Sequence, residues 1–318
     1  MPDAVRIGVV GATGAVGSVT LELLAERSLG HVRAFASVRS AGKRIAYGPA
    51  TLPVEEATPE ALAAGDLDLV FFSVGTAASE ALVPYAVEGG ATALDKSDAY
   101  RLAEGVPLVV AGVNDAAVDG ERIVANPNCS AIQLACVLKP LHDAARLRRV
   151  RLATYQSVSG AGDAAMARLR ESDAEQADLG MDWDFDGEEF SEEWKLRAET
   201  RKILALPELP LQATCVRVPV LVGHAQAVWI ETEEEISPDE ARELLAGAPN
   251  VRIAELATPR EAAGRDEVLV GRIRRDTTDR AGLALWTVND NLRKGAALNA
   301  VQIAEALLAR RALPAVSA

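Results

Sequence analysis

The chain has 318 residues, with 46 Asp and Glu against 33 Lys and Arg, which gives a formal net charge of −13. This length predicts about two domains, and 49% hydrophobic with 25% charged residues is typical of a globular protein. The negative charge argues against nucleic acid or a membrane surface as a partner, because both require a basic footprint. We expect neither a membrane span nor a signal peptide, and the odd count of three cysteines favours a reducing cytoplasm.

The negative charge is concentrated in one segment. Eleven acidic residues and no Lys or Arg lie between Glu171 and Glu193. Without these eleven, acidic and basic residues nearly balance. Because a run of like charges is usually a solvated surface, we expect residues 171–190 to be exposed, unpaired and weakly ordered.

The first part of the chain alternates strand-like and helical patterns. Strands are expected at residues 5–11, 31–37, 67–75, 92–97 and 107–113, and helices at 15–28 and 77–88. This alternation predicts a doubly wound parallel sheet of the Rossmann type, in a domain of residues 1–128.

Beyond about residue 147 the character of the chain changes. Long strand-like segments cover residues 148–160, 213–233, 267–275 and 282–290. They predict a mixed or antiparallel sheet in an α+β domain of residues 129–294. The amphipathic pattern near the end predicts a helix, and we expect residues 295–318 to return to the first domain.

Four glycines lie in the run GVVGATGAVG, which joins the first strand to the first helix, at Gly8, Gly11, Gly14 and Gly17. Glycine at this turn permits a pyrophosphate to approach the helix N-terminus, which predicts a dinucleotide cofactor. The region after the second strand, residues 37–44, offers hydroxyl groups and cations but no carboxylate for a ribose. It therefore favours NADP over NAD.

One cysteine is placed for reactivity. Pro127 and Asn128 break the preceding strand, and a helix is expected from about Ser130, so Cys129 lies at a helix N-terminus. The dipole and the free N–H groups there favour a thiolate and could hold an oxyanion. Cys136 and Cys215 are better explained as buried packing residues.

A reactive cysteine needs a proton carrier, and the chain has three histidines. His31 opens the second strand, and His142 lies late on a helix. His224 follows Gly223 at a loop-like position that suits an exposed functional group. Its pairing with Cys129 is our hypothesis.

Several motifs in order, GATGAVG, ASVRSAGK, NPNCS, TYQSVSGAG, ETRKIL, CVRVPVLVGH and DNLRKGAALN, resemble those of the aspartate-semialdehyde dehydrogenases. The resemblance runs over nearly the whole chain. It implies the reversible, NADPH-dependent reductive dephosphorylation of L-aspartyl 4-phosphate to L-aspartate 4-semialdehyde through a cysteine thioester. This reaction serves the biosynthesis of lysine, methionine and threonine. The family is generally a homodimer or a dimer of dimers.

The same resemblance implies roles in the chemistry. Cys129 would be the nucleophile, His224 the general acid/base and Gln156 the residue that orients the substrate or the intermediate. The implied cofactor-binding residues are Gly11, Thr13, Gly14, Ala15, Val16, Ser37, Arg39, Ser40, Ser159, Gly160 and Asn291. No metal is implied.

For the substrate, the resemblance implies that Arg217 binds the α-carboxylate, while Lys195 and Arg101 bind the phosphate. Asn128 would add a hydrogen bond, and Glu192 would bind the ammonium. The spacing of Glu192 and Lys195 places them on one face of a helix.

Three features near these residues leave alternatives open. We expect Ser191 to cap the helix that carries Glu192, and Glu193 is the alternative ammonium ligand. Lys96 and Asp98 stand in a stretch where the family commonly has Asn-Ser-Ser. Lys96 could contact phosphate or pair with Asp98. The acidic segment is also shorter than the family's usual apolar run.

Three other functions are less consistent with the sequence. An N-acetyl-γ-glutamyl-phosphate reductase shares the Cys and His chemistry, but its acetylated substrate has no cation for Glu192 to meet. An NADP-binding regulatory protein without catalysis would not need Cys129, Gln156, Arg217 and His224 together. A glyceraldehyde-phosphate dehydrogenase type is disfavoured because the ribose carboxylate is missing.

Overall fold

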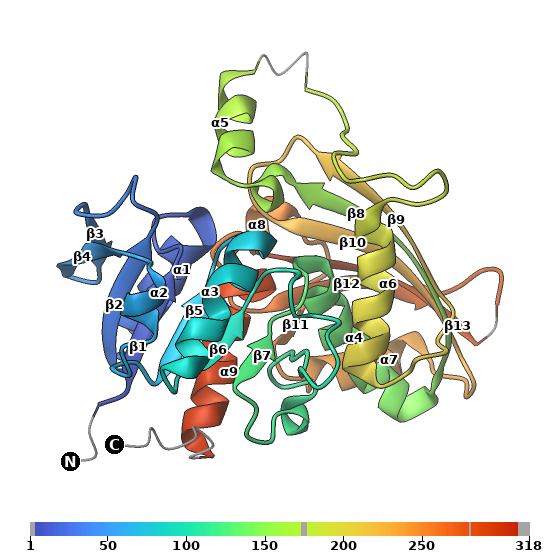
Figure 1. Cartoon of the computed structure of the whole chain (residues 1–318). Coiled ribbons are helices and arrows are strands. Elements are labelled where there is room, and N and C mark those ends of the chain that lie inside the picture. Colours follow the sequence, from blue (N-terminus) through green and yellow to red (C-terminus); the bar gives the residue numbers. More distant parts are fainter. Residues whose placement is uncertain (1–3, 173–176, 280, 311–318) are drawn as a thin grey trace. The chain divides into compact units, whose positions relative to one another are not determined.

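A computed structural model describes residues 4–172, 177–279 and 281–310 (Figure 1). The chain forms two compact units. One contains the residues up to Pro127 together with those from Ala296 onward, and the other contains Asn128–Gly295. Within the described residues, no helix is long and apolar enough to cross a membrane.

The first unit is built from strands alternating with helices. Its elements are β1 (Arg6–Val10), α1 (Ala15–Glu26), β2 (His31–Ala36), β3 (Arg44–Tyr47), β4 (Ala50–Glu56), α2 (Pro59–Leu62), β5 (Leu69–Phe72), α3 (Thr76–Glu88), β6 (Thr92–Asp95), β7 (Ile123–Ala125) and α9 (Leu298–Ala309).

The sheet of this unit has the order β3-β4-β2-β1-β5-β6-β7. All neighbouring strands are parallel except β3, which is antiparallel to β4. Because the chain winds one way from β1 to β2 and the other way from β1 to β5, the carboxyl end of β1 is a topological switch point. The predicted doubly wound sheet is confirmed.

Two details of the prediction for this sheet were wrong. The expected strand 107–113 does not form, and Leu108 makes only an isolated bridge to Ala125. The Asn114 amide oxygen accepts the N–H of Val110 at 2.8 Å, so a side chain turns the backbone away. The hairpin of β3 and β4 was missed, because Gly48 and Pro53 gave its sequence the character of a loop.

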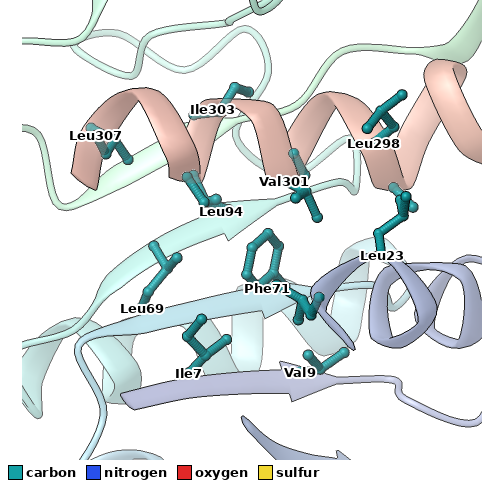
Figure 2. Close-up of a cluster of buried hydrophobic side chains, with 14 of the residues drawn as sticks. Ile7, Val9, Leu23, Leu69, Phe71, Leu94, Leu298, Val301, Ile303 and Leu307 are labelled. Carbon is teal, nitrogen blue, oxygen red and sulfur yellow. The ribbon is translucent and has the colours of Figure 1, made fainter. Parts of the chain in front are cut away.

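The C-terminal helix α9 completes the core of the first unit (Figure 2). Leucine and valine side chains of α9 pack with those of α1 and of the central strands. Each such side chain contributes roughly 1.5–3 kcal/mol when fully buried. The residues labelled in this core are Ile7, Val9, Leu23, Leu69, Phe71, Leu94, Leu298, Val301, Ile303 and Leu307.

The second unit is an α+β unit. Its main elements are α4 (Cys129–Ala145), β8 (Leu147–Ser157), α5 (Asp163–Glu171), α6 (Ser191–Leu204), β9 (Leu211–Val218), β10 (His224–Thr232), α7 (Pro238–Ala246), β11 (Val251–Ile253), α8 (Pro259–Ala262), β12 (Val268–Arg275) and β13 (Gly282–Asn289). The strand order is β11-β12-β13-β10-β8-β9. The pairs β8–β9 and β11–β12 are parallel and the others antiparallel, which confirms the predicted mixed sheet.

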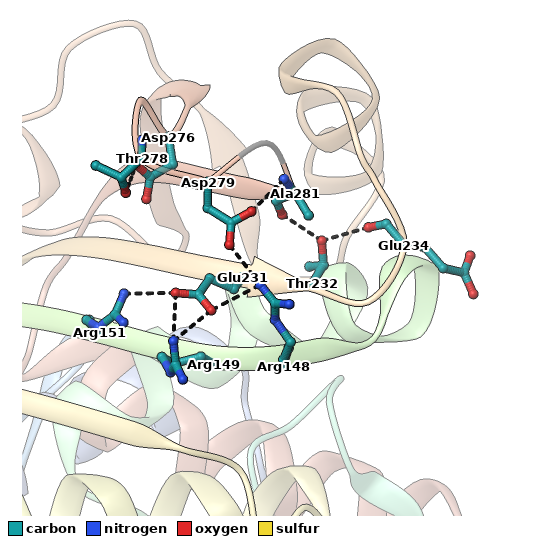
Figure 3. Close-up of polar contacts among 10 residues, drawn as sticks. All are labelled: Arg148, Arg149, Arg151, Glu231, Thr232, Glu234, Asp276, Thr278, Asp279 and Ala281. Atoms are coloured by element: carbon teal, nitrogen blue, oxygen red, sulfur yellow. Dashed lines mark hydrogen bonds and ion pairs between the residues drawn. The ribbon is translucent and has the colours of Figure 1, made fainter.

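An ion cluster joins strands β8 and β10 near the end of β10 (Figure 3). The carboxylate of Glu231, which is 7% exposed, accepts hydrogen bonds from Arg148, Arg149 and Arg151 at 2.9 to 3.3 Å. Arg148 also pairs with Asp279 at 2.7 Å. The three guanidinium groups satisfy a carboxylate that would be costly to bury alone.

The acidic segment is exposed over most of its described residues, as predicted, while residues 173–176 lie outside the described part of the chain. The expectation that it is unpaired was wrong. Asp182 pairs with Arg217 at 3.0 Å, and Glu189 pairs with Arg197. The hydrogen bond from Arg197 lowers the pKa of Glu189. These pairs tie the segment to β9 and to α6.

Lys96 does not form the ion pair with Asp98 that was one of its two possible contacts. Its ammonium donates to Thr20 Oγ1 at 2.7 Å and to Ser73 Oγ at 2.8 Å. Asp98 instead pairs with Arg101 at 2.6 Å. Lys96 therefore links α1 to the end of β5, and a phosphate contact by Lys96 stays a prediction.

Removing the Lys96 ammonium should change how stability depends on pH. Burial lowers the pKa of Lys96 to about 7, against a smaller opposing effect of Asp95. Between about pH 7 and 10 the unfolded chain therefore holds one more proton at this site than the folded chain, so stability gains with rising pH. We expect the stability of the wild type relative to Lys96→Met to rise by on the order of 2 kcal/mol from pH 7 to 9.5.

Urea unfolding of both proteins across this pH range checks the prediction. The exposed Lys43 supplies the control, because Lys43→Met also removes one lysine charge. The difference between the wild type and the control should stay flat. An equally flat difference for Lys96→Met would contradict the lowered pKa.

Candidate active site

Cys129 is the first residue of helix α4 and is partly exposed. The helix starts one residue earlier than expected, because the Asn128 side chain is its cap and accepts the N–H of Ser130 at 2.8 Å. The positive end of the helix dipole therefore lies at Cys129 and stabilises negative charge there. By contrast, burial raises the pKa of Cys136, and that of Cys215 to about 12.

Side-chain amides connect the neighbours of Cys129 to a buried carboxylate. Glu192 Oε1 accepts from Asn128 Nδ2 and from Gln156 Nε2, both at 2.9 Å. Gln156 Nε2 also donates to Ser130 Oγ at 2.5 Å. Gln156 Oε1 is buried and has no hydrogen-bond partner among the described residues. The structure thus brings Asn128, Gln156 and Glu192 together beside Cys129.

The start of α6 distinguishes the two candidate glutamates. The prediction that Ser191 caps this helix was wrong. Ser191 is the first residue of the helix, and Phe190 before it is the N-cap. The Glu193 carboxylate accepts the N–H of Phe190 and the N–H of Cys215, both at 2.9 Å. Glu193 therefore supports the backbone, while Glu192 faces the two amides. Lys195 follows on the same helix and is partly buried.

His224 is the first residue of β10 and is fully buried, so the predicted exposed loop position was wrong. Its ring Nδ1 accepts the backbone N–H of Ser157 at 3.0 Å. Because a backbone N–H can only donate, the neutral ring carries its proton on Nε2. Nε2 is buried and has no partner among the described residues. Burial, with a smaller effect of Arg217, lowers the pKa of His224 to about 3.

Arg217 lies on β9 and is buried. Its Nη1 donates to the carbonyl oxygen of Ser157 at 3.1 Å. Gly160 marks where Arg217 and His224 converge, because a Cβ at Gly160 would lie 3.0 Å from Arg217 Nη1 and 3.3 Å from His224 Nε2. A side chain at this position would therefore crowd both groups.

Two predicted cofactor residues of this unit are engaged within the protein. Asn291 Oδ1 accepts from Ser159 Oγ at 3.1 Å, from Ser157 Oγ at 3.0 Å and from the N–H of Gly223 at 2.9 Å. These bonds brace the turn that leads into His224. A cofactor contact by Ser159, Gly160 or Asn291 stays a prediction.

Three residues near the site were missed in the sequence. Ser157 orients His224, Glu199 accepts the N–H of Asn128 at 2.6 Å, and Asn289 is a buried amide without a partner among the described residues. A Cβ at Gly295 would lie 3.0 Å from Cys129 Cβ and 3.2 Å from Asn289 Nδ2. The only signal in the sequence was their position, with Ser157 in TYQSVSGAG, Glu199 in ETRKIL and Asn289 directly before DNLRKGAALN.

Arg101 belongs to the other unit. Its guanidinium donates to the carbonyl oxygens of Asn126 at 3.1 Å and Lys96 at 2.7 Å, and it pairs with Asp98. These bonds hold the side chain in one orientation. Its role as a phosphate ligand stays a prediction.

The glycine turn of the first unit fits a dinucleotide. Gly11 has φ +82°, and a Cβ there would lie 2.3 Å from Ser73 O, while a Cβ at Gly17 would lie 2.1 Å from Gly11 O. Gly14 is the N-cap of α1 and brings no side-chain acceptor, and the first turn contains no acidic residue. The N–H groups at Ala15 and Val16 therefore meet no competing anion within the helix, which suits a pyrophosphate.

The turn after β2 suits a 2′-phosphate. The N–H of Ser40 donates to Ser37 O at 2.8 Å, and Lys43 Nζ lies 3.5 Å from Ser40 Oγ. Arg39 is exposed on the same turn. Hydroxyl groups and cations thus gather where an NAD enzyme would place a carboxylate.

Comparisons with known proteins match this chain to one family over most of its length. Residues 6–121 match the family model of the semialdehyde dehydrogenase NAD binding domain, and residues 138–182 and 182–294 match that of its dimerisation domain. The aspartate-semialdehyde dehydrogenase of Corynebacterium glutamicum is 42% identical over 342 aligned positions, covering 95% of this chain and 99% of that protein.

Solved structures agree as well. Aspartate semialdehyde dehydrogenase II from Vibrio cholerae, complexed with ASA, is 35% identical with a TM-score of 0.89, over 96% of this chain and 99% of that one. The enzyme from Candida albicans with NADP is 25% identical with a TM-score of 0.80, over 98% and 100% of the two chains. By its sequence and its fold, therefore, the chain belongs to the aspartate-semialdehyde dehydrogenase family.

Proposed function

We propose that the chain catalyses the reversible, NADPH-dependent conversion of L-aspartyl 4-phosphate to L-aspartate 4-semialdehyde and phosphate. The observation that carries this proposal is the placement of Cys129 at the start of α4, next to the hydrogen-bonded group of Asn128, Gln156 and Glu192. This arrangement supports a cysteine nucleophile beside a site that can bind an amine.

In the reductive direction, the Cys129 thiolate attacks the acyl carbon and phosphate leaves, which forms a thioester. NADPH supplies a hydride to this thioester. The resulting thiohemiacetal oxyanion then expels the Cys129 thiolate and releases the aldehyde. In both tetrahedral intermediates the negative oxygen needs a hydrogen-bond donor, and the Nε2–H of His224 is the donor that we assign.

The ends of the substrate would be recognised by opposite charges. We assign the α-carboxylate to Arg217, whose guanidinium can form two parallel hydrogen bonds. We assign the ammonium to Glu192 and to Gln156 Oε1, a buried acceptor that otherwise lacks a donor among the described residues. Lys195 and Arg101 would bind the phosphate, and Asn128 would add a hydrogen bond.

We assign NADP to the first unit. Gly11, Thr13, Gly14, Ala15 and Val16 would surround the pyrophosphate. Ser37, Arg39 and Ser40 would hold the 2′-phosphate. This assignment gives the predicted domain 1–128 the role of binding the cofactor and residues 129–294 that of catalysis and dimerisation. Of the predicted segment 295–318, the described residues up to 310 would complete the first domain, and residues 311–318 lie outside the described part of the chain.

Phosphate-dependent reduction of NADP tests the function. Purified protein with L-aspartate 4-semialdehyde, phosphate and NADP should produce NADPH, and omission of phosphate should stop turnover. N-acetyl-L-glutamate 5-semialdehyde should give a kcat/KM at least about 100-fold lower, because its acetylated amine offers no cation to the Glu192 carboxylate. Equal values for the two aldehydes would reject the proposal.

The cofactor is tested in the same assay. Replacing NADP by NAD should lower kcat/KM, because the cations near Ser40 would lose the 2′-phosphate. Equal values, or values that favour NAD, would contradict the assignment of Ser37, Arg39 and Ser40.

We also infer a homodimer or a dimer of dimers in the cytoplasm. The match of the second unit to a dimerisation domain supports the dimer. Three cysteines without disulfide bonds support a reducing compartment.

A further inference from the structure

The acidic segment places a carboxylate on the arginine that we assign to substrate. Asp182 Oδ1 accepts from Arg217 Nη2 at 3.0 Å and from Arg217 Nε at 3.2 Å. The Arg217 side chain is 10% exposed, whereas that of Asp182 is 47% exposed. The pair thus joins a buried cation to an anion at the surface.

Three further contacts keep Asp182 next to Arg217. The N–H of Gly180 donates to Arg217 O at 2.8 Å, and the N–H of Arg217 donates to Gly180 O at 2.7 Å. The Trp183 ring lies 4.5 Å from the centre of the Arg217 guanidinium. Because its neighbours on both sides are attached to Arg217, the Asp182 carboxylate has a high effective concentration at this cation.

We propose that Asp182 competes with the α-carboxylate of the substrate for Arg217, and so sets the KM of the enzyme. The inference rests on the proposed role of Arg217. Both ligands are carboxylates on short aliphatic chains, and the guanidinium binds either through the same N–H groups. Asp182 thus acts as an internal substitute for the substrate's carboxylate.

The difference in exposure explains why the two carboxylates can exchange. A buried guanidinium without an anion is costly, so Arg217 needs a partner before substrate arrives. The Asp182 carboxylate can return to water at little cost, because nearly half of its surface is already exposed. Asp182 therefore neutralises the Arg217 guanidinium while no substrate is bound, and leaves it when the substrate's carboxylate binds.

Competition of this kind lowers the apparent affinity by the fraction of molecules in which Arg217 is free. Asp182→Asn removes the negative charge and preserves the shape of the side chain. We expect it to lower KM for L-aspartate 4-semialdehyde by about 3- to 10-fold while kcat changes less than about twofold.

Asp184→Asn is the matched control. It removes the same charge from the same segment, two residues away, and Asp184 is likewise exposed. Its KM should match that of the wild type. Calorimetric titration of L-aspartate 4-semialdehyde into Cys129→Ala, with and without Asp182→Asn, should show the same gain in binding affinity when chemistry is blocked.

The sign of the change in KM decides the proposal. An increase in KM with Asp182→Asn would mean that Asp182 positions Arg217 for substrate, and would overturn competition, as would an unchanged KM. Arg217→Gln separates this failure from failure of the proposed function. If Arg217→Gln leaves KM unchanged in an active enzyme, Arg217 does not bind the substrate's carboxylate, and the proposed competition by Asp182 is rejected too.

Discussion

Replacing Cys129 by alanine is expected to lower kcat for phosphate-dependent NADP reduction by about 10⁴-fold or more. The thiolate forms the only covalent bond to the substrate in the proposed reaction, so its loss removes the thioester path. The mutated side chain is small and partly exposed, so the free energy of unfolding should change little. Steady-state kinetics with L-aspartate 4-semialdehyde measure the loss, and titration with NADP should show unchanged binding.

Cys136 provides the matched control, because it lies on the same helix two turns further along. It is buried, and the same change to alanine removes only packing contacts. Cys136→Ala should keep kcat within about twofold and cost on the order of 1 kcal/mol of stability. Turnover by Cys129→Ala close to the wild-type level would reject the nucleophile and the thioester together.

Chemical labelling gives an independent measurement. Brief treatment with iodoacetamide followed by peptide mass spectrometry should modify Cys129 first. Burial raises the pKa of Cys136 and of Cys215, which keeps both as unreactive thiols. Substrate bound at the site should slow the labelling of Cys129.

The sequence predicted the fold where periodicity and glycine placement agree. Ile7 and Val9 on a short apolar strand, followed by Gly11, indicated the Rossmann-type unit, and the structure confirms it. The prediction failed where hydrogen bonds from side chains, rather than hydrophobic periodicity, determine the conformation of the backbone. The hydrogen bond from the N–H of Val110 to the Asn114 side chain turns the apolar run 107–113 out of the sheet. No pattern in the local sequence predicts such a bond.

The candidate site shows the same division. Residue types and the resemblance selected Cys129, Gln156, Glu192, Arg217 and His224, and the structure places them in one unit. What one sequence could not predict are contacts between segments that lie far apart along the chain. The bond between Asp182 and Arg217 spans 35 residues, and nothing within either segment announces it.

The burial of a single side chain could not be predicted from the sequence either. His224 follows a glycine, which suggested an exposed loop. Gly223 instead has φ +101° and approaches Pro259 so closely that a Cβ would lie 2.6 Å from its carbonyl oxygen. The turn it makes carries His224 directly into β10, where the ring is buried.

Burial of His224 predicts a different role from the general acid/base that the resemblance implies. With its pKa lowered to about 3 and its Nδ1 accepting the N–H of Ser157, the ring is neutral at working pH and presents Nε2–H. A neutral imidazole in this tautomer can donate a hydrogen bond to an oxyanion but cannot take a proton at Nε2. The proposed steps at the carbonyl carbon need only such a donor.

Substitutions of His224 separate the two roles. Loss of one oxyanion donor costs about 10²–10³ in kcat, and we expect this loss for His224→Ala. The side-chain amide of His224→Gln can place an N–H near the position of Nε2, so it should recover at least about tenfold of the loss. A general acid/base has no such substitute. Equal kcat values for the glutamine and alanine variants would therefore support proton transfer and contradict the donor.

The lowered pKa of His224 also affects the stability of the protein in acid. Below its usual pKa of about 6.5, histidine takes up a proton in the unfolded chain but not at buried His224, so stability is lost as pH falls from about 6.5 toward 3. At pH 5 this loss amounts to about 2 kcal/mol at this one residue. His224→Gln lacks it, so its stability relative to wild type should improve by that amount between pH 7.5 and 5 in urea unfolding. A relative stability that stays constant over this range would mean that the folded and unfolded chains take up this proton at the same pH, and would contradict the lowered pKa of His224.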